Sequence, residues 1–185
     1  MRIISGKHKG RRITIPSHFK IRPTTDFAKK GLFDILEHRI DWENLSVLDL
    51  FSGTGYISYE FASRGAKYIL AVDIEPTYTK FIRNTASFLK MPIQTITMDV
   101  FKFLQKQHNH NFNVIFCDPP YDLKNIELLP NLILSNKLLH EDGIIIIEHD
   151  KTVLFNQHSF FIHKRNYSKV HFSFFSKNAE KYFFK

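Results

Sequence analysis

The segment Asp118-Pro119-Pro120-Tyr121 is the most specific chemical feature of the sequence, and it directly follows an apolar run typical of a buried strand. Each proline fixes its own φ angle and lacks an N–H, so the hydrogen bonding of the strand cannot continue. Proline also holds the residue before it in an extended conformation. The pattern predicts a stiff turn that presents a carboxylate, carbonyl oxygens without competing N–H partners, and an aromatic face.

These groups suit the methylation of an exocyclic amine on a nucleobase. Such an amine is a poor nucleophile because its lone pair is delocalised into the ring. A carboxylate and a carbonyl that accept its two hydrogens favour a tetrahedral nitrogen, which can attack a methyl group held on a sulfonium. Proximity and preorganised dipoles supply most of the rate of such a reaction. Tyr121 is predicted to stack on the extracted base, and no metal is required.

A glycine-rich segment, Gly53-Thr54-Gly55, follows a second short apolar run. Glycines allow the backbone to turn tightly and to approach a ligand closely, while the N–H groups of the following helix face that ligand. The spacing matches a dinucleotide fingerprint imperfectly, because Ser58 stands where that fingerprint has a third glycine or alanine. Alone, this segment is weak evidence for any one ligand.

Four aspartates fall at or near the carboxyl ends of successive predicted strands, namely Asp49, Asp73, Asp99 and Asp118. Open α/β sheets bind ligands at this edge. Any one of these acids could equally cap a turn or a helix, but four in register favour a binding crevice. There Asp73 would accept hydrogen bonds from ribose hydroxyls and Asp99 from an adenine amine. Asp49 would shape the glycine loop and receive the cationic amino-acid end of the ligand.

Alternating strands and helices must position these groups. Apolar runs predict strands at 46–50, 68–73, 93–98, 113–117 and 143–148, with helices to about residue 64 and from 75 to 89. This alternation predicts an open, mainly parallel sheet with helices on both faces. The remaining periodic segments predict a basic hairpin at 2–16, a helix from about 25 to 40 and a closing antiparallel pair at 159–166 and 169–176.

Charge is distributed unevenly along the chain. Residues 1–30 hold nine Lys and Arg and one acid, residues 31–150 hold ten and sixteen, and residues 151–185 hold seven and one. Two basic ends that flank an acidic middle indicate a polyanionic partner, and interleaved aromatic residues favour nucleic acid.

The 185 residues suit one domain, with residues 1–23 as a hairpin extension and 24–185 as the catalytic core. The single cysteine, Cys117, suits a reducing compartment. The longest aliphatic run, Ile144–Ile147, is too short to cross a membrane, and the N-terminus lacks the apolar stretch of a secretory signal. We therefore expect a cytoplasmic protein.

The chain resembles S-adenosylmethionine-dependent amino-methyltransferases, and more narrowly the RsmD-type bacterial guanine-N2 methyltransferases of 16S ribosomal RNA. The resemblance runs from residue 2 to 121 in family order. It is carried by Arg2-Ile3-Ile4-Ser5-Gly6, Lys9-Gly10-Arg11-Arg12, Arg22-Pro23-Thr24-Thr25-Asp26, Leu32-Phe33, residues 48–55, Glu60, residues 62–66 and the Asp-Pro-Pro-Tyr turn.

The resemblance implies a Rossmann-like class I methyltransferase fold with a seven-stranded sheet, S-adenosylmethionine as methyl donor, and a monomer acting on small-subunit ribosomal RNA in an assembled or assembling 30S particle. It implies that Asp118, Pro119, Pro120 and Tyr121 hold the guanine amine. The implied donor contacts are Asp49, Phe51, Ser52, Gly53, Thr54, Gly55, Asp73, Ile74, Asp99 and Val100. The implied RNA contacts are Lys7, Lys9, Arg11, Arg12, Arg22 and Thr24.

The sequence departs from the family pattern at Phe27, where the family has arginine, and at Lys29-Lys30, where it has an arginine–glutamate pair. Three alternatives remain open. The Asp-Pro-Pro-Tyr turn is shared with enzymes that methylate the adenine N6 amine of RNA or DNA. A catalytically silent RNA-binding assembly factor would also have basic ends. A nicotinamide dehydrogenase is disfavoured by Ser58 and has no use for the paired prolines.

Overall fold

The computed structural model describes residues 1–19 and 26–182. In chain order its elements are α1 (Asp26–Leu36), β1 (Ser46–Leu50), α2 (Tyr56–Arg64), β2 (Tyr68–Asp73), α3 (Pro76–Leu89), β3 (Ile93–Thr97), α4 (Val100–Leu104), β4 (Phe112–Cys117), η1 (Ile126–Leu128), α5 (Leu129–Ser135), β5 (Leu139–His149), β6 (Phe161–Tyr167), β7 (Val170–Phe175) and η2 (Ala179–Tyr182). Within this described part, every helix is too short or too polar to cross a bilayer.

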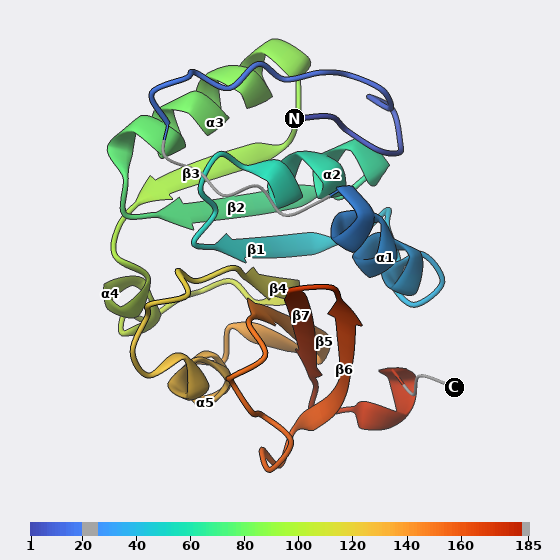
Figure 1. Cartoon of the computed structure of the whole chain (residues 1–185), viewed down its shortest axis with the longest axis vertical. Coiled ribbons are helices and arrows are strands. Elements are labelled where there is room, and N and C mark those ends of the chain that lie inside the picture. The colour runs from blue at the N-terminus through green and yellow to red at the C-terminus, as the bar shows by residue number, and fades with distance from the viewer. Residues whose placement is uncertain (20–25, 183–185) are drawn as a thin grey trace.

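The strands form one seven-stranded sheet in the order β3-β2-β1-β4-β5-β7-β6 (Figure 1). Strands β1 to β5 run parallel, whereas β7 is antiparallel to both β5 and β6. The predicted fold class is therefore confirmed. The order reverses between β1 and β4, which places a topological switch point between these two strands.

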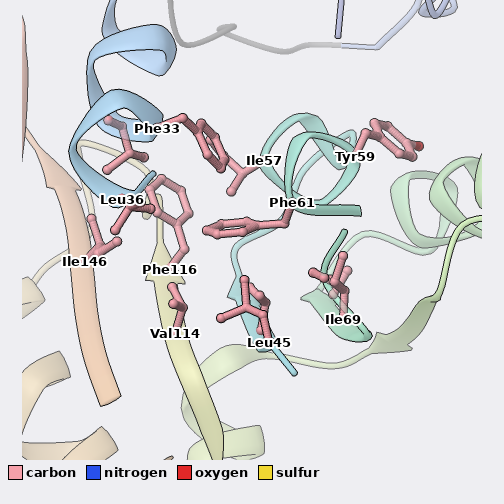
Figure 2. Close-up of a cluster of buried hydrophobic side chains, with 14 of the residues drawn as sticks. Phe33, Leu36, Leu45, Ile57, Tyr59, Phe61, Ile69, Val114, Phe116 and Ile146 are labelled. Atoms are coloured by element: carbon pink, nitrogen blue, oxygen red, sulfur yellow. The ribbon is translucent and has the colours of Figure 1, made fainter. Parts of the chain in front are cut away.

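Each face of the sheet carries its own apolar core. Along β1, Val47 belongs to the core under α1, α2 and α3, while Leu48 and Leu50 belong to the core under α4 and α5. This alternation follows from the two-residue period of a strand. Figure 2 shows part of the first core, where Phe61 of α2 lies edge-on to Phe33 of α1 with ring centroids 4.8 Å apart. Burying a phenylalanine contributes roughly 1.5–3 kcal/mol, so these rings fix both helices over the sheet.

Two element boundaries differ clearly from prediction. Helix α1 ends at Leu36 rather than near residue 40, and β5 begins at Leu139 rather than at residue 143. The short helices α4 and α5 were not predicted. Helix α4 contains only five residues and α5 seven, which is too short for a 3.6-residue period to become visible.

The N-terminal segment forms the predicted hairpin, but it is held by one antiparallel bridge, Arg2 to Arg12, rather than by a longer ladder. Backbone hydrogen bonds from Ile3 N–H to Arg11 O (3.0 Å) and from Ile13 N–H to Met1 O (2.9 Å) flank that bridge. Residues 1–13 are called the basic hairpin below.

Candidate active site

The strand register brings the predicted site residues to one edge of the sheet. Leu50, the last residue of β1, pairs with Val72 of β2 and with Cys117 of β4. The glycine loop (residues 51–55) and the diproline turn (residues 118–121) therefore leave neighbouring strands side by side. Asp118 N–H donates to Leu50 O at 3.3 Å, which ties the start of the turn to the start of the loop.

The glycine loop has an unusual backbone. Phe51, Gly53 and Gly55 have φ angles of +59°, +51° and +81°, in the left-handed region that favours glycine. A Cβ on Gly55 would lie 2.8 Å from Cγ1 of Ile82, so packing as well as conformation requires glycine there. A Cβ on Gly53 would meet no atom within 4 Å, so this side of the loop is open to a ligand.

Asp49 is buried beneath the loop with 2% exposure. Its Oδ2 accepts a hydrogen bond from Ser58 Oγ at 2.5 Å, which joins the end of β1 to the first turns of α2. Burial raises the pKa of Asp49 to about 7, although the bond from Ser58 opposes that rise. This bond goes to α2 rather than to residues 51–55, so the predicted shaping of the glycine loop by Asp49 stays a prediction. Ser58, which looked like a defective fingerprint position, supplies the hydroxyl that holds this acid.

Asp73 supports the same loop from β2. Its Oδ2 accepts from Gly53 N–H at 2.7 Å and its Oδ1 from Glu75 N–H at 2.9 Å. Burial raises the pKa of Asp73 above its ordinary value. A carboxylate has about four acceptor positions, so the predicted contact with ribose hydroxyls stays a prediction. The neighbouring Ile74 side chain is 66% exposed and offers an apolar surface beside the acid.

Asp99 caps a helix, the ordinary role considered for acids at strand ends. Its Oδ1 accepts from Lys102 N–H at 2.9 Å at the start of α4. The predicted contact with an adenine amine would have to use the remaining acceptor positions of the carboxylate. The side chain of Val100 is buried in the core under α4, so only its backbone can face a ligand.

The diproline turn differs in one respect from the prediction. Pro120 O accepts a hydrogen bond from Leu123 N–H at 2.9 Å, so this carbonyl does have a competing partner. That leaves Pro119 O as the better candidate to accept a hydrogen from an amine. Asp118 is half-buried and the Tyr121 side chain is 38% exposed. The position of Tyr121 allows the predicted stacking on a base.

The basic hairpin lies on α2, the helix that begins directly after the glycine loop. Glu60 of α2 is fully buried and accepts from Ile4 N–H (2.9 Å) and Ser5 N–H (3.0 Å). Two cations balance its charge, with Arg64 Nε at 3.0 Å and Lys29 Nζ at 3.4 Å. A buried carboxylate with this many partners fixes the hairpin to the loop helix. No local pattern indicates this role for Glu60, because a glutamate within a helix usually faces solvent.

The predicted RNA contacts of the hairpin are all on the surface, since Lys7, Lys9, Arg11 and Arg12 are exposed. The predicted contacts Arg22 and Thr24 lie outside the described residues. Lys29, one of the departures from the family pattern, has 1% exposure and donates to Arg2 O at 2.9 Å. Burial lowers its pKa to about 8, and the Glu60 carboxylate opposes that change. Lys29 is thus an internal partner of Glu60 rather than a surface contact for RNA.

Comparisons with known proteins identify the family. A family model described as conserved hypothetical protein 95 matches residues 1–176. The chain belongs to this family, the RsmD family. Ribosomal RNA small subunit methyltransferase D of Buchnera aphidicola subsp. Acyrthosiphon pisum is 31% identical over 150 residues, which cover 80% of this chain and 78% of that protein. The family resemblance inferred from the sequence is therefore confirmed.

Solved structures agree on the fold of this RsmD-family chain. A hypothetical protein of Thermus thermophilus superposes with a TM-score of 0.80 and 24% identity, covering 95% of this chain and 99% of that one. SMU.776, whose structure was solved in complex with SAH, has a TM-score of 0.62 and 18% identity and covers 82% of this chain and 50% of that one. The architecture is that of class I S-adenosylmethionine-dependent methyltransferases.

The residues around the loop fit such a donor. Ser52 Oγ is buried and has no hydrogen-bond partner among the described residues. An unpaired buried hydroxyl costs free energy unless a ligand or water satisfies it. Together with the open side of Gly53 and the exposed Ile74, this hydroxyl would suit a polar ligand that has an apolar portion. Across residues 1–19 and 26–182, His, Cys, Asp and Glu side chains form no group of three that could hold a metal ion.

Proposed function

We propose that this protein transfers a methyl group from S-adenosylmethionine to the N2 amine of a specific guanine in small-subunit ribosomal RNA. One observation carries the proposal above all others. The pairing of Leu50 with Cys117 sets the glycine loop beside the diproline turn, so a donor on the loop would lie next to an amine on the turn. Family membership supports ribosomal RNA as the substrate class.

The donor, when bound, supplies an electron-poor methyl group on a sulfonium. It is held by Ser52 Oγ and by the Asp73 carboxylate, because the N–H groups of Ser52, Gly53 and Gly55 already donate within the protein. On the other side, Asp118 and Pro119 O accept the two hydrogens of the guanine amine and favour a tetrahedral nitrogen. These acceptors are fixed before substrate arrives, so they lower the barrier without reorganisation. Tyr121 stacks on the base, and Asp118 or water accepts the proton that the methylated nitrogen releases.

Substrate binding is assigned to the exposed cations of the basic hairpin. Replacing Arg11 and Arg12 with glutamine is expected to weaken binding to unmethylated small subunits. The slope of log affinity against log salt concentration should become shallower by about 0.7–0.9 for each lost phosphate contact. Lys106→Gln is the control, because this exposed cation follows α4, on the face of the sheet opposite to the basic hairpin. An unchanged slope in the double variant would place the RNA surface elsewhere.

The reaction itself is tested with purified protein, isotopically labelled donor and small subunits from a strain that lacks this protein. Mass spectrometry of the digested ribosomal RNA should locate the label on guanine N2. Label on adenine N6, in RNA or DNA, would establish the alternative specificity and reject this one. Failure to bind S-adenosylhomocysteine by calorimetry would favour a non-catalytic assembly factor. We also infer that the protein acts in the cytoplasm as a monomer on an assembled or assembling 30S particle. Methylation of naked RNA but not of subunits would contradict the inference that the substrate is a 30S particle.

A further inference from the structure

A pocket of about 430 Å³ lies between α1 and β6, apart from the site at the sheet edge. Its lining combines two aromatic rings, three cations and one acid, namely Phe27, Tyr167, Lys30, Arg39, Arg165 and Asp34. Aromatic rings beside cations are the chemistry that binds single-stranded nucleic acid, because bases stack on the rings while the cations attract phosphates.

Gly31 lowers the stability of helix α1, but it makes room for one wall of the pocket. Glycine within a helix is roughly 1 kcal/mol less favourable than alanine. A Cβ at this position would lie 2.2 Å from Cε1 of Tyr167, so any other residue would displace the ring. The glycine therefore allows the Tyr167 ring to lie directly against the helix and to form a wall of the pocket.

Phe27 stands one turn before Gly31 and is 69% exposed. Its ring lies edge-on to that of Tyr167, with centroids 5.7 Å apart and planes at 80°. Most of the ring surface faces solvent, where a nucleobase can cover it.

The charges around the rings favour an anion. Lys30 pairs with Asp34 at 2.6 Å, so the acid is already balanced by one cation of the pocket. Arg39 Nη1 donates to Ile35 O at 2.8 Å, which fixes its guanidinium near the end of α1. Arg165 lies on β6, an edge strand of the sheet. Cations on an edge strand also discourage pairing with other chains, but that role would require neither Gly31 nor an exposed ring at Phe27.

The pocket adjoins the two regions already assigned to donor and RNA. Asp26, the residue before Phe27, accepts a hydrogen bond from the hydroxyl of Tyr56, which directly follows the glycine loop. The same Asp26 carboxylate lies 3.9 Å from Arg2 of the basic hairpin. The first turn of α1 thus connects the pocket, the loop and the hairpin, and RNA on the hairpin can continue into the pocket.

We propose that the α1–β6 pocket binds one unpaired nucleotide of the RNA substrate, with its base against Phe27 and Tyr167 and its phosphate near Arg165 and Arg39. This assignment rests on the proposed function for the identity of the RNA, but the binding of single-stranded RNA can be measured without turnover. A lack of methyl transfer would therefore refute the proposed function and leave the pocket testable.

The test is fluorescence anisotropy with labelled single-stranded oligoadenylate. Phe27→Ala should weaken binding about 5-fold or more, the loss expected for one stacked base, and Phe27→Trp should preserve it. Leu154→Ala, which removes a side chain that is 71% exposed in the loop after β5, is the matched control and should bind as wild type. S-adenosylhomocysteine binding should be equal in all three variants, which shows that they are folded.

The salt dependence of RNA binding distinguishes the contribution of the cations of the pocket from that of its aromatic rings. Arg165→Gln should weaken binding and make the salt slope shallower by about 0.7, whereas Phe27→Ala should weaken binding at every salt concentration with an unchanged slope. If Phe27→Ala binds oligoadenylate like the wild type, the proposal is overturned, even where Arg165→Gln weakens binding. Equal losses in Phe27→Ala and Leu154→Ala would overturn it as well.

Discussion

The glycine loop and the diproline turn leave neighbouring parallel strands at the same edge, but they are built by opposite means. The loop uses residues that tolerate a left-handed backbone, with positive φ at Phe51, Gly53 and Gly55. The turn uses two consecutive prolines, which restrict the backbone. The Asp73 carboxylate holds the loop at Gly53, and Asp49 holds the helix that follows it at Ser58, while backbone hydrogen bonds hold the turn at its start and near its end.

This difference sets the hydrogen-bonding character of each turn. The glycine loop offers a ligand the unpartnered hydroxyl of Ser52, because the N–H groups of Ser52, Gly53 and Gly55 already donate to Val72 O, Asp73 Oδ2 and Ser52 O. Prolines have no N–H, so a proline turn offers a carbonyl and a carboxylate and binds donors instead. The methyl donor and the amine that receives the methyl group need these opposite surroundings. We infer that the glycine loop serves the methyl donor and the diproline turn serves the amine. Substitutions in one should therefore leave the function of the other intact.

Asp118→Ala should have the largest effect, because it removes one of the two acceptors that we propose for the guanine amine. We expect kcat to fall by roughly 10²–10³, the usual cost of removing one preorganised polar group at a reacting centre. Calorimetry should show S-adenosylhomocysteine affinity unchanged, since the loop is intact. Asp122→Ala, an exposed acid in the segment that follows the turn, is the matched control. Near-normal turnover in Asp118→Ala would remove the assigned role of the turn.

Alanine substitutions at Gly53 and Gly55 should affect donor affinity and stability to different extents. Gly53→Ala places a methyl group in the open space on the ligand side, so it should lower donor affinity at least tenfold while costing only the roughly 1–2 kcal/mol of left-handed strain. Gly55→Ala adds a collision with Ile82, and overpacking costs a further 1–3 kcal/mol of unfolding free energy. Urea unfolding and calorimetry measure both quantities. The reverse ranking of the two variants would place the donor on the other side of the loop.

The buried acid under the loop should give stability a measurable pH dependence. Burial raises the pKa of Asp49 from 3.8 to about 7, so between these values the folded chain holds a proton that the unfolded chain has lost. The free energy of unfolding from this group therefore falls as pH rises from about 4 to about 7, by at most about 1.4 kcal/mol per pH unit.

Asp49→Asn should reduce that slope in urea unfolding measured across the window. Asp73 contributes in the same direction because its pKa is also raised by burial, so the variant should keep a smaller slope. Ser58→Ala removes the side-chain hydrogen bond that lowers the pKa of Asp49 and should extend the upper end of the window to higher pH. An equal slope in Asp49→Asn and the wild type would mean that this acid is ionised in the fold.

Much of the sheet edge was predictable because its signals are local. Strand β1 and strand β2 are continuous apolar runs that end at charged or glycine-rich segments, and both match the predicted bounds. The diproline turn is stiff for reasons contained in its own four residues. These features depend little on distant contacts, so the sequence alone was sufficient to place them.

The connections between distant segments were not predictable. Glu60 is buried because residues 4 and 5, more than 50 positions earlier, donate their N–H groups to it. The α1–β6 pocket depends on the packing of Tyr167 against Gly31, and no local sequence pattern predicts that contact. Long-range packing also explains the burial of Lys29. A lysine near the basic N-terminus is expected on the surface, but in the fold Lys29 is buried and pairs with Glu60.

Pro120→Ala should have the smallest effect, and it tests whether the backbone rigidity of the diproline turn contributes to turnover. Pro120→Ala releases the constraint on Pro119, whose carbonyl is the second acceptor proposed for the amine, and keeps the Asp118 carboxylate. We expect a loss of about 0.4–1 kcal/mol in unfolding free energy through the unfolded chain, and a decrease in kcat smaller than that of Asp118→Ala. Donor affinity should not change. Pro16→Ala, outside both turns, is the control. If Pro120→Ala lost stability but kept full turnover, rigidity would serve folding only, and the contrast between the two turns would reduce to their hydrogen-bonding groups.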